Sequence, residues 1–359
     1  ALGEVSGFPS ITLQPAAGAQ GEFAGMLMIR AYHEANGEQR TKVLIPDTAH
    51  GTNPASASLC GYDVVPIASD GFLRASAVAE AMDSDVAGLM ITNPNTLGLY
   101  EKEIVEICKV VHDGGGMVYC DGANLNALMG ISRPGDIGID VMHFNLHKTF
   151  STPHGGGGPG CGPVGVVEAL QPFMPVPQVA KTSDGYHLDY DRPQSVGRVK
   201  GFAGHFSILV RAYTYILSMG GEGLRRATEL AVLNANYIRA RLEDVYHLPY
   251  KQRSLHEVVF SESNLANDCH TLDVAKRLID YGFHPPTIYF PLVIKGALMI
   301  EPTETESKQA LDEFCDALLA IAKEAEESPE LLKRAPVRAK VKRLDETMAA
   351  RKPKLRWEE

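Results

Sequence analysis

The sequence predicts an α/β fold in which a mostly parallel sheet carries helices on both faces, followed by a smaller C-terminal α+β domain. Over the first 150 residues, short runs rich in β-branched residues alternate with segments of helical periodicity. These runs are apolar on both faces, as buried parallel strands are. From about Gly204 a long helical region begins, and short candidate strands and a last helix follow it. The first pattern indicates βαβ units, and the second indicates a separate α+β unit.

Each element follows from its local pattern. We expect strands at residues 10–15, 42–46, 63–68, 86–93, 117–124 and 140–146. Helices are expected at residues 18–36, where Phe23, Met26, Leu27 and Ala31 recur at helical spacing, and within residues 101–116. The second helix has one apolar face, formed by Ile104, Ile107, Cys108 and Val111, and glycines end it.

The C-terminal part has weaker strand signals. The long helical region spans residues 204–246 and is interrupted at Gly220 and Gly221. Candidate strands lie at residues 255–261, 287–293 and 297–302, and the last helix, from about Glu306 to Glu327, has an apolar face that starts at Leu311. We therefore predict a large domain at residues 1–220, a small α+β domain at 221–330 and a basic tail at 331–359.

Composition and charge exclude several classes of protein. The chain has 359 residues and a net charge of −10, which argues against nucleic acid as a partner. No apolar run reaches the roughly 18 residues that cross a bilayer, and the start lacks the features of a signal peptide. We therefore expect a cytoplasmic protein with no membrane partner. The six cysteines are scattered, so neither a disulfide framework nor a metal site is indicated.

The basic tail is the local exception to the acidic balance. Residues 333–359 contain ten Lys and Arg against four Asp and Glu. The tail is interpreted either as a solvated arm that folds back on acidic groups of its own chain, or as a surface that guides an acidic partner or clamps a second subunit. In the second case Trp357, the one tryptophan of the chain, would be an apolar anchor.

Polar residues follow most of the predicted strands. Gly18, Ala19 and Gln20 enter a helix after the first strand, where bare backbone N–H groups favour a phosphate. Later strands are followed by the residues His50, Asn93, Asp121 and Lys148. In an open parallel sheet the ligand site forms at the carboxyl ends of the strands, so these groups are expected to converge.

Together these residue types suit pyridoxal phosphate. This cofactor needs a lysine amine for its aldehyde, a carboxylate for its ring nitrogen, a flat group against the ring and a phosphate cup. Lys148, Asp121, His50 and the turn at residues 18–21 supply these groups in that order. Taken singly, a lysine after a strand is usually solvated and an aspartate there often caps a turn. The coincidence at several strand ends favours the cofactor site.

Several motifs resemble one enzyme family. They are "TNPNTLGLYE", "DGANLNA", "NLHKTFSTPHGGGGPG", "RPQSVGRVK", "HPPTIYFPL" and "MIEPTETES". They resemble the pyridoxal-dependent P-proteins of the glycine cleavage system, the glycine decarboxylases, and in particular the second subunit of the bacterial two-subunit form. The resemblance covers essentially the whole chain and implies a fold-type-I pyridoxal enzyme. It implies that Lys148 is the Schiff-base lysine, that Asp121 pairs with the pyridine nitrogen, that His50 and Ala123 lie above and below the ring, and that His147 lies near the phosphate.

The resemblance also implies a reaction and partners. Glycine would lose its carboxylate as carbon dioxide, and the aminomethyl group would pass to the lipoyl arm of the H-protein. Lys148 would carry the proton, assisted by His50 or His154. A partner subunit 1 and a dimer of such pairs, a heterotetramer, are implied, and a homodimer is the alternative. The glycine loop at residues 155–158 either lines a narrow channel for the lipoyl arm or only folds around Lys148. Such subunits have a further segment before the "GFPSITLQP" motif, so its substrate contacts are not assigned.

Two alternatives stay open. The chain could be another fold-type-I enzyme, such as an amino-acid decarboxylase or a cysteine desulfurase, in which case Cys161 is the cysteine in the most suitable loop. It could instead be a noncatalytic partner subunit that keeps the fold without the cofactor. The presence of both Lys148 and Asp121 argues against that second alternative.

Overall fold

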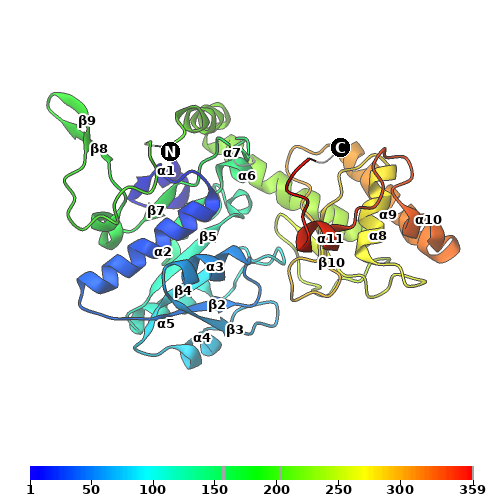
Figure 1. Cartoon of the computed structure of the whole chain (residues 1–359), viewed down its shortest axis with the longest axis horizontal. Helices are drawn as coiled ribbons and strands as arrows, with labels where there is room; N and C mark the ends of the chain where they lie inside the picture. The colour runs from blue at the N-terminus through cyan, green and yellow to red at the C-terminus, as the bar shows by residue number, and fades with distance from the viewer. Residues whose placement is uncertain (156–157, 203, 358–359) are drawn as a thin grey trace. The chain divides into compact units, whose positions relative to one another are not determined.

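The computed structural model describes residues 1–155, 158–202 and 204–357 (Figure 1). Seven strands form a large sheet in the order β1-β7-β6-β5-β4-β2-β3. They are β1 (Ser10–Thr12), β2 (Lys42–Pro46), β3 (Asp63–Ile67), β4 (Val86–Thr92), β5 (Met117–Gly122), β6 (Val141–Phe144) and β7 (Val164–Val166). Strands β2 to β6 pair in parallel, whereas β7 is antiparallel to both β1 and β6. The predicted mostly parallel sheet is therefore confirmed.

Helices cover both faces of this sheet. On one face lie α2 (Gly18–Ala35) and α3 (Thr52–Leu59), and on the other lie α4 (Ala75–Ala81) and α5 (Ile104–Asp113) (Figure 1). Two hydrophobic clusters fill the layers, and β5 contributes Val118 to the α5 side and Tyr119 to the α2 side. Successive side chains of a strand point to opposite faces, so one buried strand supplies both layers. The buried residues of α5 are the four that its sequence pattern predicted.

Helix α2 lies close to the sheet because glycines occupy its contact face. A Cβ atom added at Gly25 would lie 2.8 Å from the Tyr119 ring, and one at Gly21 would lie 2.7 Å from the carbonyl oxygen of Gly162. At Gly18 the same atom would lie 2.5 Å from Oδ1 of Asn145. These distances are shorter than van der Waals contact, so side chains there would push the helix away from the sheet.

The sequence did not predict β7 or a two-stranded hairpin. The hairpin consists of β8 (Gln178–Thr182) and β9 (Gly185–Asp189), and it extends away from the large sheet (Figure 1). Most of its side chains are exposed, so no buried face produces a clear apolar alternation. Strand β7 has three residues and follows a Gly- and Pro-rich loop, which hides its signal. The remaining short helices before residue 206 are α1 (Leu2–Ser6), α6 (Leu146–Thr149), η1 (Leu125–Ala127), η2 (Pro134–Ile137) and η3 (Glu168–Phe173).

The predicted long helical region is α7 (Phe206–Leu242), and its predicted interruption is at Gly220. The backbone there has φ 61° and ψ −179°, which is not helical. Cα proximity divides the chain into two compact units, and the main boundary falls inside α7, between Asn236 and Tyr237. Residues 252–258 and 302–305 belong to the first unit. The predicted domain limits at residues 220 and 330 stay a prediction.

The C-terminal part contains a small sheet and several helices, as an α+β domain does. The sheet has the order β10-β12-β11, with β10 (Val258–Phe260), β11 (Thr287–Ile288) and β12 (Leu298–Ile300). The helices are α8 (Thr271–Asp280), α9 (Lys308–Glu327), α10 (Pro329–Arg334) and α11 (Glu346–Arg351). On α9 the residues Leu311, Cys315, Leu318 and Ile321 are buried. None of the helices in the described part of the chain combines the length and apolarity that a membrane span requires.

The first part of the basic tail is bound to α8. The carboxylate of Asp280 accepts hydrogen bonds from the backbone N–H groups of Val337, at 2.9 Å, and Arg338, at 2.7 Å. Nη2 of Arg343 donates to Oδ1 of Asp273 at 2.6 Å. The excess positive charge of the tail lies in residues 333–344, which contain no Asp or Glu. These contacts agree with the interpretation of the tail as an arm folded back on acidic groups of its own chain.

We expect Asp280→Ala to lower the free energy of unfolding at pH 7 by about 3 kcal/mol, because it removes the buried acceptor of two N–H groups and of Arg277. Burial opposes ionisation of Asp280, but these donors hold its pKa below the usual value. Such a group stabilises the fold above its unfolded-state pKa of about 4 and loses that effect as the pH falls through its folded-state pKa. Chemical denaturation should therefore show a difference between variant and wild type that shrinks below about pH 4. The exposed Glu313→Ala is the control, and an equal loss in both variants would contradict the prediction.

A second stability prediction concerns the loop after β4. Gly98 has φ +72°, and a Cβ atom there would lie 2.1 Å from the backbone carbonyl oxygen of Glu257. We expect Gly98→Ala to cost about 3 kcal/mol, because backbone strain and a clash with main chain act together. Gly197→Ala is the matched control, since Gly197 has φ +89° with no atom within 4 Å of an added Cβ, and it should cost about 1 kcal/mol. Equal unfolding midpoints for the two variants would show that the clash is absent.

Candidate active site

The predicted polar residues gather at the carboxyl edge of the large sheet. Asp121 is the penultimate residue of β5, Asn93 follows β4, and Lys148 lies in α6, directly after β6. Thr92 of β4 pairs with Asp121, and Asp121 pairs with His143 of β6, so the three strand ends are adjacent. Burial opposes ionisation of Asp121, and the charge of Lys148 is among the influences that lower its pKa, so the amine lies within electrostatic reach of the carboxylate. The chain therefore brings the predicted lysine and aspartate together.

Asp121 is a buried carboxylate that is held ionised. Its Oδ1 accepts a hydrogen bond from the Ala123 N–H at 2.9 Å, and its Oδ2 accepts one from Nδ2 of Asn53 at 3.1 Å. Nε2 of His143 lies 3.4 Å from Oδ1. Burial opposes ionisation, but His143, these donors and the charge of Lys148 hold the pKa of Asp121 below its usual value. Among the described residues, no Lys or Arg forms an ion pair with it.

His143 is fixed behind Asp121 by its own contacts. Its Nδ1 lies 2.5 Å from the hydroxyl oxygen of Tyr119, and its Nε2 lies 2.6 Å from the side-chain amide of Asn145. Burial lowers the pKa of His143, so the imidazole is neutral at neutral pH. A neutral, doubly hydrogen-bonded ring keeps one orientation beside the carboxylate.

Sequence reasoning missed four residues of this cluster. They are Glu22 on α2, Asn53 on α3, Tyr119 on β5 and His143 on β6. One signal existed for Glu22, because it lies four residues before Met26 and seven before Ile29, on the apolar face of the helix. A carboxyl group on that face is buried unless the helix ends there. The other three are brought to Asp121 by strand register and helix packing, which a single sequence does not reveal.

Residues 18–21 form the first turn of α2 and not a separate turn. The N-cap residue, Ala17, has no side-chain acceptor, so the N–H groups of Gly18, Ala19 and Gln20 point out of the helix end without a capping side chain. The Gln20 side chain is already used, because its Oε1 accepts from Ala16 N–H at 2.7 Å and its Nε2 donates to the Val199 carbonyl at 2.6 Å. A helix end of this kind offers backbone donors and a positive dipole to an anion.

The remaining predicted residues surround Lys148. The Lys148 side chain is exposed and His147 is half-buried, with its ring edge-on to the His154 ring at 4.5 Å between centroids. Burial, and then the charges of His154 and Lys148, lower the pKa of His147 to about 4. His50 is exposed after β2, and its Nδ1 lies 2.8 Å from the Thr52 hydroxyl oxygen. Burial is the main cause of the lowered pKa of His143, and His50 adds to it electrostatically, so the two rings lie within electrostatic reach of each other.

The glycine loop is described only in part. Gly156 and Gly157 lie outside the described residues. Gly155 has φ +91°, and its carbonyl oxygen accepts a hydrogen bond from the N–H of Gly158 at 2.8 Å. Gly155 thus has a left-handed backbone conformation, which favours glycine. Neither interpretation of the loop, as a channel wall or as a fold around Lys148, is decided by this contact.

Several features fit pyridoxal phosphate. A buried carboxylate held ionised without a paired cation is an environment that a protonated ring nitrogen completes. Near the strand ends, buried polar atoms lack a hydrogen-bond partner within the described residues: Nδ2 of Asn93 and Oγ1 of both Thr149 and Thr152. The amino end of α2 lies over the end of β6, because Gly18 closely approaches Asn145. An amine, a carboxylate, free donors and a helix end therefore converge at one place.

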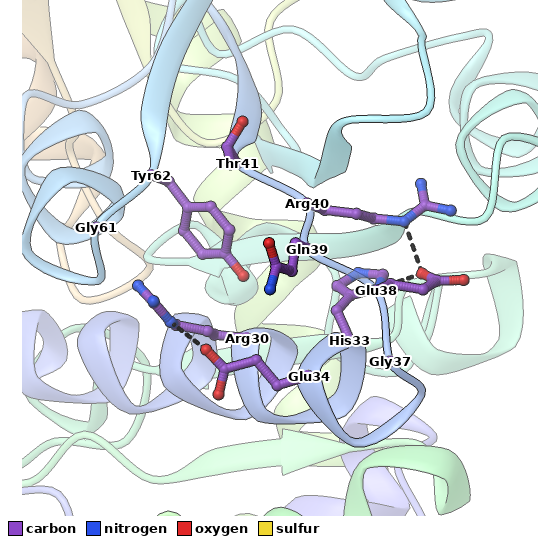
Figure 2. A pocket seen from close by; sticks show the side chains of 10 residues that line it. All are labelled: Arg30, His33, Glu34, Gly37, Glu38, Gln39, Arg40, Thr41, Gly61 and Tyr62. Carbon is purple, nitrogen blue, oxygen red and sulfur yellow. Dashed lines mark hydrogen bonds and ion pairs between the residues drawn. The ribbon is translucent and has the colours of Figure 1, made fainter.

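A pocket of about 420 Å³ lies elsewhere in the first unit (Figure 2). It is lined by the last turns of α2 and by residues 37–41 and 61–62, which precede β2 and β3. It is therefore at the opposite edge of the sheet from Asp121. Figure 2 shows that Nε of Arg30 pairs with Glu34, at 2.8 Å, and Nε of Arg40 with Glu38, at 2.7 Å. Because each guanidinium is already neutralised, the pocket offers no net charge to a phosphate.

Comparison with known proteins identifies the family. A model described as "Glycine dehydrogenase, C-terminal domain" matches residues 227–338. A relative from Caldanaerobacter subterraneus subsp. tengcongensis is 58% identical over 361 residues, covering 99% of this chain and 74% of the relative. One from Exiguobacterium sibiricum is 59% identical and covers 99% of this chain and 73% of the relative. Both are named "Probable glycine dehydrogenase (decarboxylating) subunit 2". The chain belongs to the glycine dehydrogenase (decarboxylating) subunit 2 family.

Solved structures with a similar fold include several enzymes. A crystal structure of glycine decarboxylase (P-protein) of the glycine cleavage system, in inhibitor-bound form, aligns with a TM-score of 0.74 at 20% identity, over 89% of this chain and 73% of that one. A Lactobacillus brevis glutamate decarboxylase aligns with a TM-score of 0.71 at 15% identity, over 91% and 78%. A cysteine desulfurase from Escherichia coli gives 0.68 at 16% identity, over 90% and 82%. The predicted fold-type-I pyridoxal enzyme fold is confirmed, and the fold alone does not choose among these activities.

Proposed function

We propose that this subunit, with a partner subunit 1, decarboxylates glycine using pyridoxal 5′-phosphate and passes the aminomethyl group to the lipoyl arm of the H-protein. The observation that carries the proposal is the buried, ionised Asp121 within electrostatic reach of the Lys148 amine, in a chain of the glycine dehydrogenase subunit 2 family. Fold-type-I neighbours support the cofactor class. Glycine, the partner subunit and the H-protein follow from the family resemblance.

The residues at the carboxyl edge would hold the cofactor by distinct contacts. Lys148 would carry the aldehyde carbon on its Nζ, Asp121 would accept the ring N–H, and the first N–H groups of α2 would face the phosphate. Asn93 offers its unpartnered Nδ2 as a further donor. When bound, the cofactor supplies an electron-poor ring that takes up the electron pair of the breaking bond. Roles for His50 and Ala123 at the two faces of the ring follow from the resemblance.

The chain's own groups set the protonation of the site. Nζ of Lys148 is exposed at the end of β6, so it can take and return a proton at the substrate. Burial lowers the pKa of His147 to about 4 in the chain without cofactor, so its neutral ring can donate a single hydrogen bond to a phosphate. Asp121 stays ionised and so keeps the proton on the ring nitrogen. His143 accepts or donates without charge and keeps Asp121 in place.

The overall reaction balances without a further oxidant. The bond between the α-carbon and the carboxylate of glycine breaks and releases carbon dioxide. The two electrons of that bond reduce the lipoyl disulfide: the methylene carbon bonds to one sulfur, the bond between the sulfurs breaks, and the second sulfur takes up a proton. The lipoyl group is thus both the acceptor of the aminomethyl group and the oxidant.

The alternatives have weaker support. A cysteine desulfurase needs an accessible thiolate, but Cys161 is 1% exposed, and burial raises the pKa of its thiol. The other five cysteines are also buried. A noncatalytic partner would have no use for an ionised carboxylate that is buried without a paired cation, because burying such a charge is costly. Both observations favour the decarboxylase.

Exchange of labelled carbon dioxide into the carboxyl group of glycine tests the proposal. The chain, its partner subunit, pyridoxal phosphate and lipoylated H-protein should together catalyse the exchange, and omission of any one should reduce it strongly. The same mixture offered cysteine should release no sulfide above the background of free cofactor. An exchange rate that is equally high without this chain would contradict the proposal. Release of sulfide from cysteine would favour the cysteine desulfurase.

A further inference from the structure

Glu22 lies directly beside Asp121, and no step of the proposed reaction uses it. Its side chain comes from the second turn of α2 and is 4% exposed. Nδ2 of Asn53 donates to Oε2 of Glu22 at 2.8 Å, and the same nitrogen donates to Oδ2 of Asp121 at 3.1 Å. Carboxyl oxygens of the two acids and a ring nitrogen of His143 all lie within 4.8 Å of one another. Two buried carboxyl groups therefore share one amide donor.

Two carboxylates this close in a buried site do not both ionise. Asp121 is the acid that stays ionised, because it also accepts a hydrogen bond from the Ala123 N–H and faces His143. Glu22 has Asn53 and, at 3.5 Å, the hydroxyl of Ser56. Burial, and next the charge of Asp121, raise the pKa of Glu22 to about 8. At neutral pH the pair therefore holds one negative charge, on Asp121, and one proton, on Glu22.

We propose that Glu22 is a positioning residue for Asp121: its neutral carboxyl group, tied to Asp121 through Asn53, limits the site to a single negative charge at the position of the cofactor's ring nitrogen. This inference rests on the proposed function. Loss of the Glu22 proton adds a second negative charge there and changes the field at the ring.

Few other groups compete for this role. The titratable and charged groups that face Glu22 are Tyr119 and Asp121 from β5, His143 from β6 and Lys148 from α6. Helix α3 contributes the neutral Asn53 and Ser56. Burial raises the pKa of Tyr119 well above its usual value and lowers that of His143, so both groups are neutral at neutral pH. Glu22 is thus the carboxyl group beside Asp121 whose pKa, about 8, lies within the range of the titration.

The visible absorption of the bound cofactor measures the effect. Holoenzyme with its partner subunit is titrated from pH 6 to pH 9.5 as wild type, Glu22→Gln and Glu101→Gln. Glu101 is the matched control, since it is another buried glutamate, 1% exposed, hydrogen-bonded to Asn95 and to the Leu73 N–H. The nitrogen that joins Lys148 to the cofactor also loses a proton in this range and gives a spectral step in every variant. Wild type and Glu101→Gln should show a further change with a midpoint at or below about pH 8, because the positive ring nitrogen favours ionised Glu22. Glu22→Gln should keep the first step and lack this further change. Glu22→Met, also neutral and of similar length, should behave in the same way if the glutamine variant is unstable.

The chain without cofactor gives an independent readout. The folded-state pKa of Glu22 lies above its unfolded value, so the folded chain binds more protons between about pH 5 and pH 8, and its stability falls as the pH rises through that window. The unfolding temperature of Glu22→Gln minus that of wild type should therefore grow by several degrees over this range. A spectrum with the same pH dependence in wild type and in both Glu22 variants, or a temperature difference independent of pH, would overturn the positioning role alone. A wild type that binds no cofactor would overturn the proposed function and this role with it.

Discussion

Lys148→Ala abolishes glycine decarboxylation and leaves the fold of the chain intact; this is the largest effect that we expect. In the proposed function the amine holds the cofactor's aldehyde and moves a proton at the substrate, so the rate should fall by at least about 10⁴-fold. The side chain is exposed in the one-turn helix α6, and its loss should change the free energy of unfolding by no more than about 0.5 kcal/mol. Carbon dioxide exchange and thermal unfolding measure the two quantities.

Lys109→Ala is the matched control for this experiment. Lys109 is an exposed lysine on α5, on the face of the sheet opposite to α2, and it pairs with Asp113. It should retain full exchange activity. Borohydride reduction of the holoenzyme should attach the cofactor to the peptide that contains Lys148 in the control and in the wild type. Turnover retained by Lys148→Ala, or attachment to another lysine, would contradict the assignment.

Asp121→Asn lowers the exchange rate by about 10³-fold while the cofactor stays bound through Lys148. A neutral amide cannot hold the ring nitrogen protonated, so the ring loses the charge with which it accepts electrons. Both carboxylate oxygens of Asp121 accept hydrogen bonds, one from the Ala123 N–H and one from Nδ2 of Asn53. In the asparagine variant an NH₂ group replaces one of these acceptors and faces a donor, which should lower the free energy of unfolding by about 2 kcal/mol. The rate, the visible spectrum and the unfolding midpoint are measured together. A normal exchange rate in a folded, cofactor-bound variant would show that another group supports the ring nitrogen.

The elements that the sequence predicted are those whose signals are local. Strand β5 is a buried apolar run that ends in Asp121, and α5 has one apolar face, so both follow from spacing alone. The groups at the strand ends were predictable for the same reason, since topology places the carboxyl ends of parallel strands at one edge. Lys148 and Asp121 needed no knowledge of long-range packing.

The rest of the site depends on contacts between distant segments. Asn53 reaches Asp121 across 68 residues of chain, and His143 meets it through the register of β5 and β6. Strand β7 reverses direction within a Gly- and Pro-rich stretch, which a local pattern cannot show. Glu22 and Asp121 share the Asn53 donor because the helices pack at a particular position along the strands of the sheet. That position is set by tertiary packing and not by local sequence.

Helix α2 is a stiff rod of 18 residues that joins two parts of the site. Its amino end carries N–H groups without a capping side chain, which we propose bind the phosphate, and Glu22 lies in its second turn. The glycines at positions 18, 21 and 25 leave no soft layer of side chains between the rod and the sheet. A displacement of one end of α2 is therefore transmitted along the whole helix, because few side chains lie between α2 and the sheet that could absorb it by changing rotamer. We therefore expect an anion bound at the amino end of α2 to restrict the movement of Glu22 beside Asp121, so that anion binding and the protonation of this acid pair are coupled.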